Sequence, residues 1–366
     1  MLAPSDETEL SALLADRHGL SAPLRIAGGG SRVQTAHVAA DTLTTTGLSG
    51  VVDYSPGEMT LIVRTGTPLS FIEALLAAEG QALAFEPPDL RAVLGGNQVS
   101  TIGGMVAANA SGPRRIFAGA CRDHLLGVRF VDGQGRIIKN GGRVMKNVTG
   151  LDLTKLMAGA HGTLGVLTQV ALKTLPAAHT RATLVFSGLD EVQAVRIFCT
   201  ALATPFEPSG AVYHNGTAWL RIEGMEAQLA YRRSRLLELF ADQRVELLDD
   251  AATRSLWRGL RDLGHIGEGP LWRVLTRPTD APGIASALRG IGGRTALDWG
   301  GGLIWYCGPG DAARIRAIAP HATLIRRGTA TGPAFPPQTE ALARLSSGLR
   351  HAFDPAGILN PGLMDA

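Results

Sequence analysis

Two glycine-rich turns, each next to the end of a predicted strand, place the strongest constraint on this chain of 366 residues. Gly28, Gly29 and Gly30 form the first turn, and Gly103 and Gly104 form the second. Because glycine has no Cβ, successive backbone N–H groups in such a turn can point at one anion and hold phosphate without a lysine. Two such turns favour a diphosphate gripped from two sides, as in a dinucleotide. The alternative is that the glycines only form tight turns.

The turns differ from the common nucleotide-binding patterns. A GxGxxG fingerprint opens a helix inside a strand–helix–strand unit and is followed by an acidic residue, whereas the glycines of the first turn here are contiguous. The sequence contains no GxxxxGK[ST] motif, which excludes P-loop phosphate chemistry. These patterns disfavour NAD and favour a flavin bound outside the Rossmann fold.

The length predicts two domains, because a single core rarely grows beyond about 250–300 residues. A hydrophobic content of 45% with 18% charged residues is typical of a packed globular chain and excludes disorder. The net charge is +3 and the basic residues are spread along the chain. Nucleic-acid binders concentrate such residues in patches, so we expect no nucleic-acid partner.

Three widely spaced cysteines without a CxxC motif disfavour disulfides and an iron–sulfur cluster held by this chain alone. Any redox cofactor should therefore be organic. The longest uncharged run, residues 92–113, carries polar residues and glycine pairs, so we expect no membrane span. The N-terminus is acidic rather than basic, which disfavours a secretory signal and makes the cytoplasm the expected location.

The order of predicted elements changes at residue 176. Before it, we expect a helix at 7–17, strands at 24–27, 43–46, 60–64 and 166–175, and a hairpin over 125–139. After it, the order β-α-β-β-α-β occurs twice, over 182–248 and 271–326, with a helical link near 251–262. This order is that of a ferredoxin-like unit, with an antiparallel sheet and helices on one side. The predicted domains are 1–176 and 177–332, with a C-terminal segment, 333–366, that returns to the first domain.

Several motifs, taken together, resemble the FAD-binding domain of the vanillyl-alcohol oxidase (PCMH-type) flavoproteins. They occupy residues 25–31, 87–89, 100–112, 162–166 and 354–362. Within this family, residues 112–115, 143–150, 271–273 and 298–301 are similar to the FAD-binding E subunits of bacterial glycolate oxidase (glycolate dehydrogenase) complexes. The resemblance implies an α+β fold: a PCMH-type FAD-binding domain of two α/β subdomains, and a cap domain of two ferredoxin-like units.

The resemblance also implies cofactor contacts, residue by residue. Contacts to the diphosphate, or support for it, are implied for Gly28, Gly29, Gly30, Ser31, Ser100, Thr101, Gly103, Gly104, Asn109 and Asp123. Contacts near the flavin ring or its ribityl chain are implied for Pro88, Asp89, Gly162, Gly165, Val166 and Asn360, the last closing over the flavin.

The sequence departs from the family pattern at two kinds of site. Covalent members attach the flavin through a His in the first turn or a Cys in a later one. Here Ser31 occupies the first place and Cys121 lies in an unrelated context, so noncovalent FAD is expected. Hydroxyacid-oxidising members carry a metal motif resembling GHxGDGNxH. Residues 264–272 begin like it, but Glu268, Pro270 and Trp272 replace the required Asp, Asn and His. We therefore expect no metal and interpret His265 as a loop histidine.

No catalytic residue is assigned, but the predicted cap strands carry two candidates for a substrate-facing role, Arg273 and Trp299. An arginine there could pair with a substrate carboxylate. The alternative is that Trp299 belongs to the core and Arg273 to an internal ion pair.

The resemblance implies the FAD-binding subunit of a complex that oxidises glycolate to glyoxylate. A base would remove the hydroxyl proton while the α-hydride goes to the flavin. The implied partners are a larger FAD-containing hydroxyacid-oxidising subunit and an iron–sulfur subunit, through which the chain could reach a membrane surface. Two alternatives stay open: a self-sufficient FAD-dependent 2-hydroxyacid dehydrogenase, and a non-catalytic assembly subunit with structural FAD.

Overall fold

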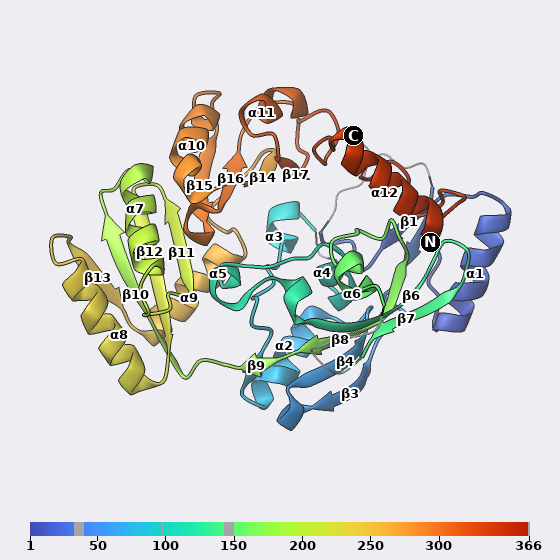
Figure 1. Cartoon of the computed structure of the whole chain (residues 1–366), viewed down its shortest axis with the longest axis horizontal. Helices are drawn as coiled ribbons and strands as arrows, with labels where there is room; N and C mark the ends of the chain where they lie inside the picture. The colour runs from blue at the N-terminus through green and yellow to red at the C-terminus, as the bar shows by residue number, and fades with distance from the viewer. Residues whose placement is uncertain (33–39, 97, 143–149, 365–366) are drawn as a thin grey trace. The chain divides into compact units, whose positions relative to one another are not determined.

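The computed structural model describes residues 1–32, 40–96, 98–142 and 150–364, and these form two compact units (Figure 1). Unit 1 comprises Met1–Ala110, Ala120–Pro176 and Pro337–Ala366, and unit 2 comprises Ser111–Gly119 and Ala177–Pro336. Most of the sequence motif at 143–150 lies outside the described residues.

Unit 1 is built around a five-stranded antiparallel sheet. Its order is β3 (Val51–Ser55), β4 (Thr60–Arg64), β8 (Val166–Lys173), β6 (Leu125–Val131) and β7 (Ile137–Gly141). Apolar side chains of β4, β6 and β8 share one core with α2 (Leu69–Ala78), α4 (Ile102–Ala107) and α6 (Leu153–Met157). The expected hairpin over 125–139 is the pair β6–β7, which ends at Gly141.

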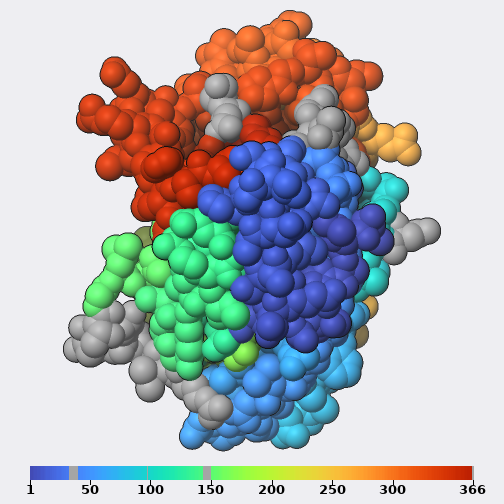
Figure 2. Space-filling view, turned by 90° about the vertical axis from the view of Figure 1, so that its right-hand side faces the viewer, coloured from blue at the N-terminus to red at the C-terminus, as the bar shows by residue number. Residues whose placement is uncertain are grey.

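A second, smaller layer of unit 1 joins the two ends of the chain. Helix α1 (Glu7–Gly19) begins at its N-cap Asp6, and Leu10 and Leu14 of α1 are fully buried. They pack with Leu24 of β1 (Leu24–Ala27) and Leu43 of β2 (Asp41–Thr44), two parallel strands. The C-terminal segment adds a parallel bridge between Leu359 and Leu24. Figure 2 shows this C-terminal segment (red) beside the N-terminal residues (blue) on the molecular surface.

Two strands end earlier than the apolar pattern predicts. The strand expected at 43–46 is β2, which ends at Thr44. The hydroxyl of Thr44 donates to the Gly28 carbonyl at 3.0 Å, and the Thr45 N–H donates to the Ala27 carbonyl at 2.9 Å. These contacts turn the chain at the end of β1. Strand β8 likewise ends at Lys173, two residues before the expected end.

Unit 2 contains the predicted repeat. Its eight-stranded antiparallel sheet has the order β13-β10-β12-β11-β15-β16-β14-β17. The first half uses β10 (Thr180–Ser187), β11 (Gly210–His214), β12 (Thr217–Gly224) and β13 (Val245–Leu248). The second half uses β14 (Leu271–Leu275), β15 (Arg294–Asp298), β16 (Leu303–Cys307) and β17 (Thr323–Arg326). The two halves meet where β11 pairs with β15. This architecture confirms the predicted pair of ferredoxin-like units.

Helices cover both faces of this sheet, in contrast to the expectation of one. Helices α7 (Glu191–Leu202), α8 (Glu226–Leu239), α10 (Ala281–Arg289) and α11 (Ala312–Ile318) share one core with Ala211 and Tyr213 of β11. Val212, between these two residues, instead packs with Trp257 of α9 (Asp250–Arg261). Because successive strand residues point to opposite faces, the linking helix α9 covers the other face.

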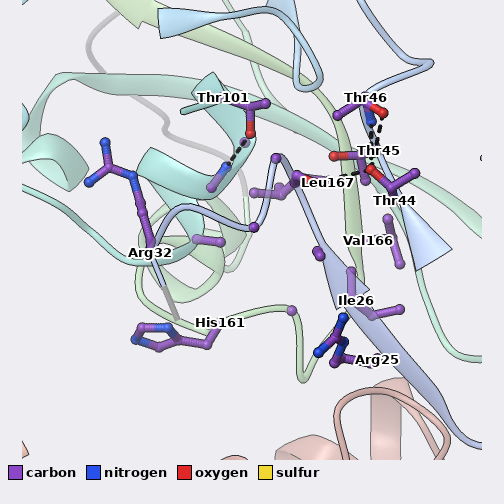
Figure 3. A pocket seen from close by; sticks show the side chains of 18 of the residues that line it. Arg25, Ile26, Arg32, Thr44, Thr45, Thr46, Thr101, His161, Val166 and Leu167 are labelled. Carbon is purple, nitrogen blue, oxygen red and sulfur yellow. Dashed lines mark hydrogen bonds between the residues drawn. The ribbon is translucent and has the colours of Figure 1, made fainter. Parts of the chain in front are cut away.

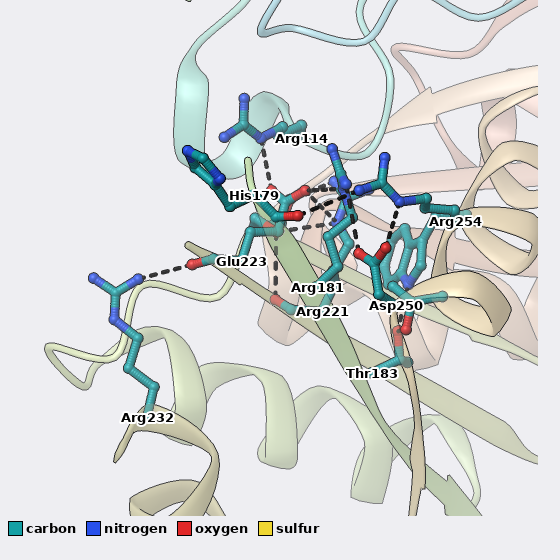
Figure 4. A network of polar contacts seen from close by, with 12 residues as sticks. Arg114, His179, Arg181, Thr183, Arg221, Glu223, Arg232, Asp250 and Arg254 are labelled. Carbon is teal, nitrogen blue, oxygen red and sulfur yellow. Dashed lines mark hydrogen bonds and ion pairs between the residues drawn. The ribbon is translucent and has the colours of Figure 1, made fainter. Parts of the chain in front are cut away.

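A buried ion-pair network fixes the Ser111–Gly119 segment to unit 2 (Figure 4). The Glu223 carboxylate on β12 accepts from Arg114 Nε at 2.8 Å and from Arg181 Nε at 3.0 Å. Arg221 Nε lies 3.9 Å from the same carboxylate. Because the Glu223 side chain is only 5% exposed, its charge depends on these arginines. The sequence boundary at 176 placed residues 111–119 in the first domain. The structure corrects that placement, since the boundary was drawn from chain order and Glu223 lies far along the chain.

Replacing Glu223 by alanine should destabilise the protein, because three guanidinium groups lose their shared counter-charge. We expect the free energy of unfolding, measured by urea titration, to fall by about 3–5 kcal/mol. The control is Glu238→Ala, which removes an exposed carboxylate that pairs with Arg235 and should change the value by less than about 0.5 kcal/mol. Equal effects of the two substitutions would contradict this account.

The contribution of Glu223 should also depend on pH. Burial alone would raise its pKa, but the charges of Arg221, Arg114 and Arg181 and a hydrogen bond with Ser209 lower the pKa from 4.5 to about 2. A lowered folded-state pKa stabilises the fold above the unfolded-state pKa and loses that effect as the pH falls. The difference in unfolding free energy between wild type and Glu223→Ala should therefore shrink from pH 4.5 toward pH 2. A difference independent of pH over that range would refute the assignment.

Candidate functional site

A cavity of about 770 Å³ lies within unit 1, at the ends of β1 and β2 (Figure 3). Its volume is in the range of sites for large organic ligands. Its lining includes most of the predicted cofactor contacts, namely Gly28, Gly29, Gly30, Ser31, Thr101, Gly103, Gly104, Gly162, Gly165, Val166 and Asn360. These residues come from both glycine turns, from the loop before β8 and from the C-terminal segment.

The two glycine turns touch each other at one end of this cavity. A Cβ on Gly28 would lie 2.3 Å from Thr101 Oγ1, and a Cβ on Gly29 would lie 1.6 Å from the Val99 carbonyl oxygen. Neither position therefore has room for a side chain. Gly30 adopts a left-handed conformation with φ of 77°, which turns the chain away from β1. The two glycine-containing segments therefore lie close together, as a site for a diphosphate requires.

Gly103 and Gly104, predicted as a turn, instead lie in the first turn of helix α4, which its own hydrogen bonds hold in place. Thr101 is the N-cap of α4, and its hydroxyl accepts from the Gly104 N–H at 3.3 Å. Gly103 packs against Thr65, to whose carbonyl its N–H donates at 2.7 Å. A Cβ on Gly103 would lie 2.7 Å from the Thr65 Cβ, whereas one on Gly104 would meet no atom closer than 3.4 Å. Gly103 therefore permits close packing, whereas a Cβ on Gly104 would make only ordinary van der Waals contacts.

Asn360 ties three parts of the cavity wall together. Its side-chain oxygen accepts from the Ile26 N–H at 2.7 Å, and its side-chain nitrogen donates to the His161 carbonyl at 2.8 Å. His161, itself in a left-handed conformation with φ of 50°, donates its N–H to the Ala107 carbonyl at 2.9 Å. The Asn360 amide thus joins β1 to the loop before β8, in addition to lining the cavity.

The described lining is electropositive, since it includes Arg25 and Arg32 but no Asp or Glu. Arg32 is 8% exposed, and its Nη2 donates to Ser100 Oγ at 3.0 Å. Ser100 therefore supports the wall through Arg32 rather than lining the cavity itself. In Figure 3, Arg32 lies on one side of the pocket and Thr44, Thr45 and Thr46 on the other. A cavity with this charge and these hydroxyl groups suits an anionic ligand such as a diphosphate.

Arg32 and the three threonines were not among the site residues predicted from the sequence. A signal for Arg32 was available, because it lies two positions after Gly30, the last residue of the first glycine turn. The threonines form a run after β2, but the strand pattern assigned them to the sheet. Their place in the cavity follows from the pairing of β2 with β1.

Besides Ser100, four predicted contact residues do not line the cavity: Pro88, Asp89, Asn109 and Asp123. Asp89 forms an ion pair with Arg91 at 2.6 Å; burial would raise its pKa, but hydrogen bonds from Arg91 lower it. Asn109 accepts from the Arg122 N–H, and Asp123 from the Ala120 N–H. Their cofactor contacts stay predictions.

Cys121 does not line the cavity either. Its side chain is fully buried, and this burial raises the pKa of the thiol to about 12. A thiol with such a pKa carries almost no thiolate at neutral pH, so it is a poor nucleophile.

In unit 2, the candidates Arg273 and Trp299 lie together. The Arg273 guanidinium carbon is 5.2 Å from the centre of the Trp299 ring, and that of Arg115 is 4.5 Å from it. Trp299 is 8% exposed, which agrees with the core alternative. Within the described residues, no carboxylate lies within ion-pair distance of Arg273, so the ion-pair alternative is wrong for that residue.

Burial is costly for the Arg273 charge. Desolvation and the nearby charge of Arg115 lower its pKa to about 10, against the opposing effect of Asp298. A cation–π contact supplies about 0.5–2 kcal/mol, whereas removing an ion from water costs several kcal/mol. The stacking on Trp299 therefore does not offset the cost of burying this arginine.

His265 lies in the loop between α9 and β14, as interpreted from sequence. Its ring contacts that of His214, with the centres 5.1 Å apart, and burial and the His214 charge lower its pKa to about 4. In the part of the chain that the structure describes, no group of three or more His, Cys, Asp or Glu side chains is placed to hold a metal ion.

Known proteins resemble this chain, both within unit 1 and over nearly its whole length. A protein-family model described as "FAD binding domain" matches residues 1–141. The glycolate oxidase subunit GlcE of Escherichia coli (strain K12) is 36% identical over 353 residues, which cover 94% of this chain and 93% of that protein. The chain belongs to the GlcE family of FAD-binding subunits. This confirms the predicted family, the predicted cofactor FAD and an FAD-dependent oxidoreductase class.

Two further likenesses extend this family assignment. The glycolate oxidase subunit GlcD of Bacillus subtilis (strain 168) is 34% identical over 137 residues, which cover 37% of this chain and 28% of that protein. Relatives named as subunits imply a multi-subunit enzyme. The crystal structure of an alkyldihydroxyacetonephosphate synthase matches with a TM-score of 0.71 at 14% identity, over 98% of this chain and 75% of that chain, and confirms the fold class. None of the described helices is both long and apolar enough to span a bilayer.

Gly29→Ala tests the contact between the two turns. The added Cβ would lie 1.6 Å from the Val99 carbonyl oxygen and must push the turns apart. We expect FAD affinity, measured by titration of the FAD-stripped protein, to fall at least about tenfold. The matched control is Gly57→Ala, because no atom lies within 4 Å of a Cβ at that position. An unchanged FAD affinity in Gly29→Ala would show that the contact between the turns does not shape the site.

Proposed function

We propose that this chain is the FAD-binding subunit of a complex that oxidises glycolate, or a similarly small 2-hydroxy acid, to glyoxylate. The observation that carries the proposal is the likeness to the glycolate oxidase subunit GlcE over nearly the whole of both chains. The cavity of unit 1 supports it, because two touching glycine turns and two arginines suit the diphosphate of FAD. When bound, FAD supplies an acceptor for the hydride that leaves the substrate carbon.

The residues around the cavity would hold the cofactor chiefly through the backbone. Amides of the turn at Gly28–Gly30 would face the diphosphate, Gly103 and Gly104 would let the ligand approach the backbone closely, and Arg32 would add positive charge. The attachment is proposed to be noncovalent. Ser31 cannot form the histidyl link of covalent members, and Cys121 is buried away from the cavity with a raised pKa.

The proposed partners are a larger FAD-containing subunit that carries the hydroxyacid site and an iron–sulfur subunit that exports electrons. The similarity to GlcD supports the first partner. The second is supported by the dispersed thiols, since Cys121 lies in unit 1 and Cys199 and Cys307 in unit 2, with no cluster among the described residues. We place the complex in the cytoplasm, at the inner face of the membrane through its partners.

Co-purification from the native host tests this proposal. We expect the tagged chain to carry FAD that acid precipitation releases, together with a second flavoprotein and an iron–sulfur protein. The purified complex should reduce an artificial electron acceptor with glycolate. A folded chain that contains no FAD and does not rebind it would defeat the cofactor assignment, and a complex inert toward glycolate would defeat the substrate.

A second candidate is a self-sufficient 2-hydroxyacid dehydrogenase, which the buried Arg273 favours because it could bind a substrate carboxylate. One measurement separates this candidate from the first. Glycolate or D-lactate, added without oxygen, would bleach the flavin absorbance of this chain in the absence of its partners. Structural FAD is the third possibility. In that case, complexes assembled with an FAD-free Gly29→Ala chain would turn over glycolate at the wild-type rate.

A further inference from the structure

Trp299 is held rigidly at the turn between β15 and β16. Its indole N–H donates to the Gly112 carbonyl at 3.0 Å, and its backbone N–H donates to the Asp298 carboxylate at 2.6 Å. Its φ of 54° lies in the left-handed region, and Gly300 and Gly301 follow with φ of 65° and 101°. A bulky residue persists in this conformation only when its surroundings hold it, and such strain often marks a functional site.

Two arginines from separate segments meet at this ring. Arg273 comes from β14, and Arg115 from the Ser111–Gly119 segment that the Glu223 network fixes to unit 2. Arg273 is partly buried, and in the described part of the chain it has no hydrogen-bond or ion-pair partner. Among the described residues, Asp298 is the carboxylate that acts on it electrostatically.

From this juxtaposition we propose that Arg273, with Arg115 and Trp299, forms a subsite in unit 2 for a small carboxylate. A guanidinium group presents a planar pair of N–H donors that matches a carboxylate in bidentate geometry. The flat face of Trp299 would fix the plane of the guanidinium. The identity of this anion as the carboxylate of the 2-hydroxy acid rests on the second candidate function, in which this chain itself oxidises the substrate.

Oxalate is a suitable probe, because it carries carboxylates but no hydrogen that the flavin could accept. Binding to the FAD-loaded protein is measured by calorimetry and by quenching of tryptophan fluorescence, with uncharged acetamide as the control ligand. We expect saturable oxalate binding by wild type and none by acetamide. Arg273→Gln should weaken oxalate binding at least about tenfold, the loss expected for a charge-assisted pair of hydrogen bonds. Arg273→Lys should bind between wild type and Arg273→Gln, because it keeps the charge but loses the planar donors.

The matched control is Arg277→Gln, which removes an arginine four positions away whose side chain is 83% exposed and pairs only with Asp280. It should bind oxalate as wild type does. FAD content should be unchanged in all three variants, since the FAD cavity lies in unit 1.

Two results would overturn the subsite: absence of oxalate binding by wild type, or wild-type affinity in Arg273→Gln or Arg273→Lys. If Arg273→Gln does not fold, the oxalate affinity of Arg273→Lys tests the subsite instead. Oxalate binding that depends on Arg273, in a complex inert toward glycolate, would uphold the subsite and reject the proposed substrate. Glycolate turnover by the complex that survives Arg273→Gln would uphold the proposed function, in which the partner carries the hydroxyacid site, and would reject the 2-hydroxy acid as the anion of this subsite.

Discussion

The contact between the two glycine turns is the constraint on which the rest of unit 1 depends. Gly28 and Gly29 lie so close to Thr101 and Val99 that no side chain fits between them. Their contact brings the backbone of Gly28–Gly30 and the start of α4 together in the cavity wall. A site built in this way depends on backbone geometry more than on the identity of polar side chains. Substitutions that enlarge the residues at this contact should therefore disturb the site most.

Other features of unit 1 serve to hold these turns in position. Asn360 joins β1 to the loop before β8, and Thr101 caps helix α4, whose first turn contains Gly103 and Gly104. Arg32 and Ser100 add a hydrogen bond across the two turns. The C-terminal segment thus contributes to a site whose other residues lie in the first 170 positions. Removing that segment would open β1 as well as the cavity.

Unit 2 shows how one anionic side chain organises several cationic ones. Glu223 holds the Ser111–Gly119 segment, and that segment supplies Arg115 and the Gly112 carbonyl to Trp299. The segment follows the second glycine turn along the chain, so one continuous stretch of sequence serves both units. Within unit 2, the charge of Glu223 is matched by its arginines, whereas that of Arg273 is not.

The sequence by itself determined the class of fold and the nature of the main site. The repeated β-α-β-β-α-β order predicted both halves of the cap sheet, because strand and helix periodicities are local properties. The glycine-rich segments predicted an anion site, because residues without a Cβ let two backbone segments and a ligand approach closely. Three features could not be predicted from local sequence patterns. They are the pairing of Glu223 with Arg114, the place of Arg32 in the cavity, and the packing of α9 on the second face of the cap sheet. Only the tertiary structure decided these, since they depend on how sheets pair and pack and not on any local pattern.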